Sequence, residues 1–194
     1  MNIELRELAE LAKKTGTILE RHGMQYHLTG GVVASLYGET RNTQDVDIVV
    51  EMNACKNRQA LFLDLKKEFY IDQRAFNEAI QMNSMFQVLD MDSMLRADIY
   101  TASVLPCCFE RIVQVAIVEG VSLPIASPED SILSKLHWIK LGSGRSRKDV
   151  VAMLRVQEHL DNAYLETTAE QLGVKAILDE LRQIAESYDP HVIL

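Results

Sequence analysis

Residues 28–50 read LTGGVVASLYGETRNTQDVDIVV, and this stretch decides the fold. Residues 25–29 predict a short strand, Gly30 and Gly31 a turn, and residues 32–37 a short helix. The segment 45–51 is rich in β-branched residues and predicts a central strand. The stretch therefore predicts a strand, a glycine turn and a helix, followed by a second strand that begins with two acids.

Helices and strands alternate around this stretch and then give way to helices alone. Further predicted elements are an amphipathic helix over 3–22, a helix over 56–70, and strands over 85–89, 95–101, 113–118 and 121–125. Short polar turns separate the strands within each of the two pairs, so both pairs predict hairpins.

Ser127 begins a different kind of sequence. A serine, a proline and two acids in succession form a helix N-terminus, because serine caps and proline fits the first turn. The helices predicted after it cover 132–141, 148–157, 162–172 and 175–188. We therefore expect an α/β (α+β) core with a mixed sheet over residues 1–126 and a C-terminal helical subdomain over 127–194.

The composition is that of an ordinary globular protein. Of 194 residues, 47% are hydrophobic and 25% are charged, which gives no reason to expect a disordered tract. No segment reaches the roughly 18 uncharged apolar residues of a membrane span, and the first residues lack the order of a signal peptide. We expect a soluble, cytoplasmic protein with no membrane partner.

Charge and cysteine content argue against two further classes, broad nucleic-acid binding and a disulfide or zinc framework. The formal net charge of −8 argues against sequence-independent nucleic-acid binding, which requires many Lys and Arg side chains. Three cysteines, two of them adjacent, match neither a disulfide framework nor a zinc site with two Cys-x-x-Cys arms.

The strongest chemical indication is the pair Asp45 and Asp47. Residues two apart on a strand project from the same face, so two carboxylates lie close together there. Like charges at this spacing are unfavourable when desolvated unless a cation lies between them, and oxygen ligands without His or Cys favour magnesium. Taken alone, an Asp-x-Asp pair is more often two solvated acids at a strand end than a metal site.

Gly30 and Gly31 add a second indication. They end one predicted strand and open a helix, where backbone amides and the helix dipole can hold phosphate oxygens. A simple tight turn is the alternative. Together, a phosphate-binding turn and a metal-binding acid pair supply the positioning and charge neutralisation that phosphoryl transfer needs.

These residues resemble the nucleotidyltransferase superfamily related to DNA polymerase beta. In that signature, Gly-Gly or Gly-Ser is followed by a strand that bears Asp-x-Asp. The form Arg41, Thr43, Asp45 and Asp47 is similar to small bacterial members that include components of toxin-antitoxin systems. The resemblance covers residues 28–50 only.

The resemblance implies a third carboxylate on a later strand, and Asp98 in LRADIYTAS is the best-matching position. Asp90 and Asp92 are alternatives, although they fall in a predicted turn, where Asp is common for local hydrogen bonds.

The resemblance also implies a later basic element, which Lys135, Arg147, Lys148 and Asp149 fill. Lys135 is expected either to reach nucleotide phosphates or to be a solvated surface lysine. Gly142, Ser143 and Gly144 interrupt the helical pattern, so Arg147 and Lys148 are expected on a mobile loop. Such a loop would suit a triphosphate or an RNA backbone, and an ordinary helix connection is the alternative.

The resemblance implies a reaction in which one or two Mg²⁺ ions and a nucleoside triphosphate are required and pyrophosphate is released. The acceptor hydroxyl is expected on tRNA or other RNA, a protein or a small molecule. One alternative is a catalytically weak, antitoxin-like module that binds nucleotide and a cognate toxin or antitoxin protein. Another is a metal-dependent phosphohydrolase.

Overall fold

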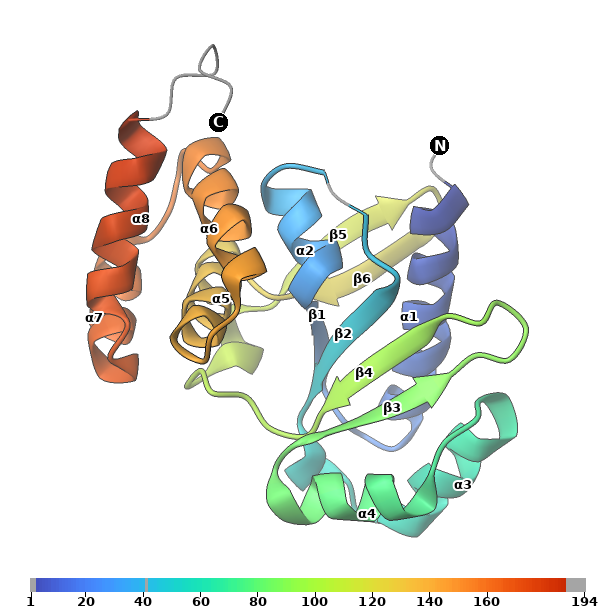
Figure 1. Cartoon of the computed structure of the whole chain (residues 1–194). Helices are drawn as coiled ribbons and strands as arrows, with labels where there is room; N and C mark the ends of the chain where they lie inside the picture. Colours follow the sequence, from blue (N-terminus) through green and yellow to red (C-terminus); the bar gives the residue numbers. More distant parts are fainter. Residues whose placement is uncertain (1–2, 41, 188–194) are drawn as a thin grey trace. The chain divides into compact units, whose positions relative to one another are not determined.

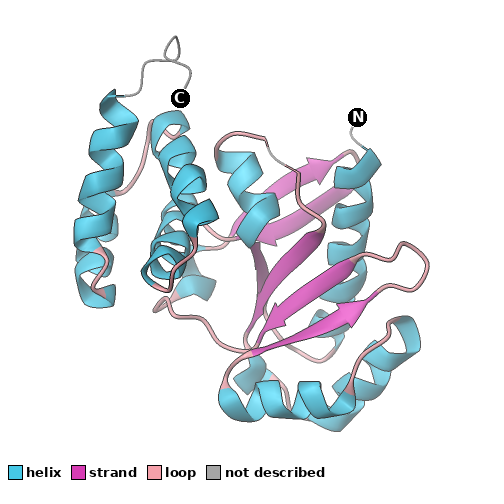
Figure 2. Ribbon diagram, in the orientation of Figure 1, coloured by secondary structure: helices cyan, strands magenta, loops and turns pink. Residues whose placement is uncertain are grey.

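The computed structural model describes residues 3–40 and 42–187, and the strands among them form one mixed sheet (Figure 2). The sheet order is β3-β4-β2-β1-β6-β5. The strands are β1 (Tyr26–Thr29), β2 (Asp45–Val50), β3 (Met85–Leu89), β4 (Arg96–Tyr100), β5 (Val113–Val118) and β6 (Val121–Ile125). The pairs β2–β4 and β1–β6 are parallel, and β1–β2, β3–β4 and β5–β6 are antiparallel. Both predicted hairpins are therefore confirmed.

Apolar and polar residues alternate along the central strands, so the sheet has one apolar face and one polar face. Val46 and Ile48 of β2 are buried, whereas Asp45 and Asp47, which alternate with them, are only partly buried. Helix α1 (Ile3–Arg21) covers the apolar face (Figure 1). It approaches closely at Gly16, where an added Cβ would lie 2.0 Å from the hydroxyl oxygen of Tyr26. The acids of β2 therefore project from the face opposite α1.

Two helices and two short 3₁₀ segments complete the connections in this part of the chain. Their bounds are α3 (Arg58–Glu68), α4 (Gln73–Met82), η1 (Met52–Ala54) and η2 (Cys108–Arg111). Phe76 of α4 packs against Phe62 and Phe86, with ring centroids 5.4 and 5.0 Å apart. The sequence analysis predicted one helix over 56–70 and missed α4, which Asp72 caps by accepting a bond from the Ala75 amide.

Four helices follow residue 126, namely α5 (Pro128–Lys140), α6 (Gly144–Val156), α7 (Asn162–Leu172) and α8 (Lys175–Ser187). Ser127 accepts a hydrogen bond from the Asp130 amide, which confirms the predicted N-cap. Helix α6 begins at Gly144, so Arg145, Arg147 and Lys148 lie on a helix and the prediction of a mobile loop is wrong. The predicted break itself is confirmed, because α5 ends at Lys140 and α6 begins at Gly144, which fits the alternative of an ordinary helix connection.

Contacts group the described residues into two compact units. One holds 3–32 and 42–126, and the other holds 33–40 and 127–187. Helix α2 (Gly30–Tyr37), which begins two residues earlier than predicted, contributes to both. Within the second unit, the Gln157 side chain donates to the Tyr37 carbonyl at 2.7 Å, and Arg155 donates to Glu39 at 2.9 Å. The predicted domains, 1–126 and 127–194, stay a prediction.

Across the part of the chain that the structure describes, no helix combines the length and apolar character needed to cross a membrane. Cys55, Cys107 and Cys108 form no disulfide there.

Candidate active site

Four polar side chains form a row across the polar face of the sheet. In the register of the strands, Asp47 of β2 lies beside Thr29 of β1 on one side and Asp98 of β4 on the other. Gln87 of β3 lies beside Asp98 and ends the row. Because paired residues share a face, strands far apart in sequence bring Asp47 and Asp98 together. Asp45 lies on the same face, two residues before Asp47.

Asp47 lies against Gly30 and Gly31, which open helix α2 where the sequence predicted a turn. Its Oδ2 accepts a hydrogen bond from the Gly31 amide, with a nitrogen–oxygen distance of 3.4 Å. Gly30 has a φ of +69°, and a Cβ built on it would lie 1.8 Å from the same Oδ2. Gly30 is therefore required twice, for its backbone conformation and for the space that the carboxylate fills.

The Asp45 carboxylate is hydrogen-bonded by a residue of the loop that precedes β2. The Thr43 hydroxyl donates to Asp45 Oδ1 at 3.0 Å. This bond connects two of the residues that carry the sequence signature. Arg41, the first residue of that signature, lies outside the described residues.

The environment of Asp98 raises the pKa of its carboxyl. Burial raises the pKa of its carboxyl, a hydrogen bond from Gln87 lowers it, and the charge of Asp45 raises it again, with a net rise. Gln87 Nε2 donates to Asp98 Oδ1 at 2.9 Å. The rise from Asp45 means that negative charge accumulates on this face of the sheet.

Tyr100 is a member of the site that the sequence analysis missed. Its hydroxyl donates to Asp47 Oδ1 at 3.3 Å. Burial raises the pKa of this hydroxyl, and the charges of Asp47 and Asp98 raise it further, so the group stays a donor. Its position two residues after Asp98 on one strand was the available signal, and for Gln87 on β3 the sequence carried none.

The donor set fits a hard divalent cation. Carboxylates from two adjacent strands, without His or Cys, are the ligands that Mg²⁺ prefers. Among the residues that the structure describes, no three His, Cys, Asp or Glu side chains converge closely enough to form a metal site. Asp47 accepts hydrogen bonds from the Gly31 amide and the Tyr100 hydroxyl, and Asp98 accepts one from the Gln87 side chain.

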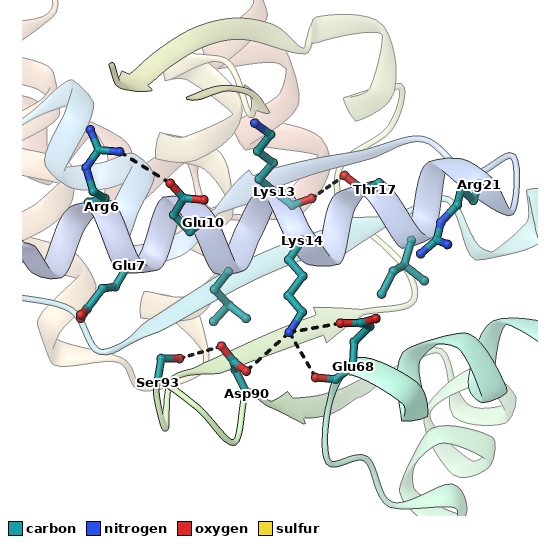
Figure 3. A pocket seen from close by; sticks show the side chains of 12 residues that line it. Arg6, Glu7, Glu10, Lys13, Lys14, Thr17, Arg21, Glu68, Asp90 and Ser93 are labelled. Carbon is teal, nitrogen blue, oxygen red and sulfur yellow. Dashed lines mark hydrogen bonds and ion pairs between the residues drawn. The ribbon is translucent and has the colours of Figure 1, made fainter. Parts of the chain in front are cut away.

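Asp90 faces a different part of the first unit. It accepts a hydrogen bond from the Ser93 hydroxyl in the turn between β3 and β4, at 2.9 Å. Lys14 of α1 lies 3.6 Å from the Asp90 carboxylate and 3.4 Å from that of Glu68, as Figure 3 shows. These contacts are on the α1 side of the sheet, opposite Asp45 and Asp47. Asp92 is exposed in the same turn.

The Lys14 contacts lie in a groove of about 700 Å³ between α1 and the β3–β4 turn. Its lining contains both acidic and basic side chains, and Lys13 points away from Lys14 and its partners Glu68 and Asp90 (Figure 3). The groove therefore contains a structural ion-pair cluster and does not adjoin the row of Asp47 and Asp98.

The later basic residues lie in the second unit. Lys135 is 7% exposed, and its ammonium donates to Asp149 Oδ2 at 2.6 Å. The alternative of a solvated lysine is therefore wrong. Arg147 pairs with Glu180 of α8, and Lys148 is exposed on α6. Their predicted role as nucleotide contacts stays a prediction.

Solved structures with similar folds are found over almost the whole chain. An antigenic nucleotidyltransferase-like protein from Paracoccidioides brasiliensis matches with a TM-score of 0.54 and 16% identity, covering 94% of this chain and 93% of its own. The antibiotic-resistance factor ANT(2'')-Ia matches with a TM-score of 0.51 and 15% identity, covering 94% and 92%. The fold is nucleotidyltransferase-like.

Sequence comparison adds nothing to this: no family model matches the chain, and no curated protein matches it. A nucleotidyltransferase-like fold at such low identities does not by itself define an activity, which has to be argued from the site. Neither similar structure is described as part of a toxin-antitoxin system, so that expectation stays a prediction.

Proposed function

We propose that this protein is a magnesium-dependent nucleotidyltransferase, which transfers a nucleoside monophosphate from a nucleoside triphosphate to an acceptor hydroxyl. One observation carries the proposal: Asp45, Asp47 and Asp98 share the polar face of a nucleotidyltransferase-like sheet, and the Gly30–Gly31 turn abuts Asp47. Phosphoryl transfer depends on positioning and on charge stabilisation, and this arrangement offers residues for both.

The acids would hold the metal. We assign Asp45, Asp47 and Asp98 as ligands of one or two Mg²⁺ ions, which supply positive charge to the triphosphate and its developing leaving group. The Thr43 and Tyr100 hydroxyls fix the two acids of β2 through one hydrogen bond each. Both donors are neutral, so they orient the carboxylates without cancelling their charge.

The glycine turn would seat the triphosphate. Gly31 donates to Asp47 over a long 3.4 Å, so a phosphate oxygen could replace the carboxylate as acceptor at little loss. It lies in the first turn of α2, where the helix dipole favours anions. Further nucleotide contacts that we propose are Arg41, Thr43, Lys135, Arg147, Lys148 and Asp149.

The bond changes are those of an in-line displacement. The acceptor oxygen forms a bond to the α-phosphorus, the bond from that phosphorus to the bridging oxygen breaks, and pyrophosphate leaves. The acceptor proton passes to a base, and we assign Asp98, since burial raises its pKa and so increases its basicity. The acceptor class, whether tRNA or other RNA, a protein or a small molecule, follows from the experiment below.

The test is a transfer assay with each α-labelled nucleoside triphosphate, magnesium and total cellular RNA or lysate. Asp47→Asn should abolish labelling of the acceptor, because it removes a charged ligand and leaves the side-chain shape. Asp92→Asn is the matched control, since it makes the same charge change at an exposed turn and should keep wild-type transfer.

Three outcomes would overturn the proposal. Full transfer by Asp47→Asn would exclude the assigned acids. Magnesium-dependent nucleotide binding without transfer would favour an antitoxin-like module with a cognate toxin or antitoxin partner. Release of free phosphate without labelling of an acceptor would favour a phosphohydrolase.

A further inference from the structure

We infer that Gln87 is a positioning residue for Asp98, a role that rests on the function proposed above. Gln87 lies on β3, at the edge of the sheet, in register with Asp98. Its side-chain amide donates to Asp98 Oδ1 at 2.9 Å. Among the described residues, it is the side chain whose hydrogen bond sets the direction of that carboxylate.

The bond fixes one degree of freedom that matters for a ligand. A carboxylate rotates freely about its last carbon–carbon bond, and a single donor on one oxygen stops this rotation. Because Gln87 holds Oδ1 and the carboxylate is planar, the position of Oδ2 is fixed as well, and Oδ2 stays available as a metal ligand. Groups that orient metal ligands in this way commonly change metal affinity by about 10- to 100-fold when they are removed.

The role proposed for residue 87 requires a side chain that is neutral and donates a hydrogen bond. Asp98 is partly buried and lies near Asp45, so its negative charge is already unfavourable without a cation. A lysine at position 87 would donate the same bond but would offset the charge that attracts the metal. A glutamate would accept instead of donate and would add repulsion. Glutamine donates and stays neutral.

The contribution of Gln87 to the fold is small. It is exposed on an edge strand, and the residues on either side of it, Phe86 and Val88, carry the buried contacts. Exposed substitutions of this kind usually change stability by about 0.5 kcal/mol or less. If substitution of Gln87 lowers metal affinity, the cause would therefore be a changed orientation of Asp98 and not unfolding of the sheet.

The chain offers a matched control on the opposite edge. Gln114 of β5 is also an exposed glutamine on an edge strand of the same sheet, in register with Pro124 of β6. Methionine has nearly the length of glutamine but donates no hydrogen bond. Gln87→Met and Gln114→Met therefore make the same chemical change at two edges, one beside Asp98 and one distant from it along the sheet.

The experiment is a calorimetric titration of the full chain with Mn²⁺ alone, followed by Mg²⁺. Gln87→Met should weaken metal binding by about 10-fold, whereas Gln114→Met should match wild type and both should keep the wild-type unfolding midpoint. In the transfer assay, raising magnesium should restore the rate of Gln87→Met, while its KM for the nucleotide stays unchanged at saturating metal.

The outcomes separate this role from the proposed function. If wild type binds Mn²⁺ and Gln87→Met binds it equally well, Gln87 does not position Asp98 and the proposed function is unaffected. The same conclusion follows if Gln114→Met weakens binding as much as Gln87→Met. If wild type binds no Mn²⁺, the metal site is wrong, and the proposed function and this role fail together.

Discussion

At the scale of single residues, Gly30 leaves no room for a side chain. Any side chain there meets two separate obstacles, a φ of +69° and a carboxylate oxygen 1.8 Å from the new Cβ. A positive φ alone costs about 1–2 kcal/mol for a residue with a Cβ. The second obstacle can be relieved only by moving Asp47.

Gly30→Ala should therefore destabilise the protein by more than the backbone cost alone and should displace the Asp47 carboxylate. Gly120→Ala is the control, because Gly120 has a φ of +79° but no atom within 4 Å of an added Cβ. Urea unfolding of both variants measures the difference. Equal losses of stability would mean that Asp47 moves aside without penalty.

Asp98 gives the protein a pH-dependent stability in metal-free buffer. Its folded-state pKa is raised above the unfolded value of about 3.9, chiefly by burial. Between these two values the native state binds more protons than the unfolded state, so stability falls as the pH rises through that window. The ionised carboxylate is thus destabilising at neutral pH.

Asp98→Asn should consequently be more stable than wild type at pH 7 without metal, and the difference should shrink as the pH falls to about 4. Asparagine keeps an acceptor for Gln87. Urea unfolding at both pH values checks this, with Asp92→Asn as the control for a charge change at an exposed position. A constant difference at the two pH values would contradict the prediction.

The sequence predicted the site residues that follow from local spacing, and it missed the residues that hydrogen-bond to them. Asp45 and Asp47 share a face because of strand geometry alone, and Gly-Gly after a strand marks a turn wherever it occurs. Tyr100 and Gln87 act through contacts with acids on other strands. Such contacts depend on strand order, which no local pattern encodes.

At the scale of elements, Lys135 of α5 and Asp149 of α6 form the buried connection between these two helices. Both side chains are at least nine-tenths buried. Removing one member of a buried pair leaves an uncompensated charge, which typically costs about 3–5 kcal/mol. The contact therefore holds α5 and α6 together whether or not Lys135 also meets a nucleotide.

Lys135→Met should lower the free energy of unfolding by about 3 kcal/mol or more. Replacing Asp149 by leucine in the same chain should restore part of the loss, since no charge then remains buried. Lys148→Met, which removes an exposed lysine from α6, should change stability by about 0.5 kcal/mol at most. Additive losses in the double variant would show that the two side chains are not coupled.

Element types were predictable wherever the pattern was local and regular. The cap at Ser127 and both hairpin turns were found because their signals lie within a few residues. Helix α4 was missed because its short apolar stripe, Phe76, Ala79 and Ile80, follows directly after another helix. The start of α6 was misplaced because two glycines in GSG indicated a loop, although Gly144 takes the first helical position.

At the scale of the whole molecule, ligand binding should raise stability. A ligand that binds only the folded state adds about 2.7 kcal/mol at 100 times its dissociation constant. Magnesium with a nucleoside triphosphate should therefore raise the thermal midpoint of wild type, and Asp45→Asn should lose most of this shift. An equal shift in both proteins would mean that the ligand binds away from these acids.

The fold class was predictable from the succession of elements, whereas the strand order was not. Pairing β2 with β4 requires residues about fifty apart in sequence to meet in one register, with Asp47 beside Asp98. A slip by one residue would turn Asp98 to the face that α1 covers. Long-range register is decided by packing of the complete sheet, which sequence patterns do not describe.

Helix α2 has a consequence for how this protein could have arisen or could be divided. Its first residues belong with the sheet, whereas Tyr37 and Glu39 at and beyond its end bond to Gln157 and Arg155 in the later helices. A gene fragment that stops at residue 126 would keep the Tyr37 carbonyl and the Glu39 side chain and would lose the donors of both, Gln157 and Arg155. Because each unit is built from two separate stretches of the chain, a single cut in the gene cannot separate one from the other.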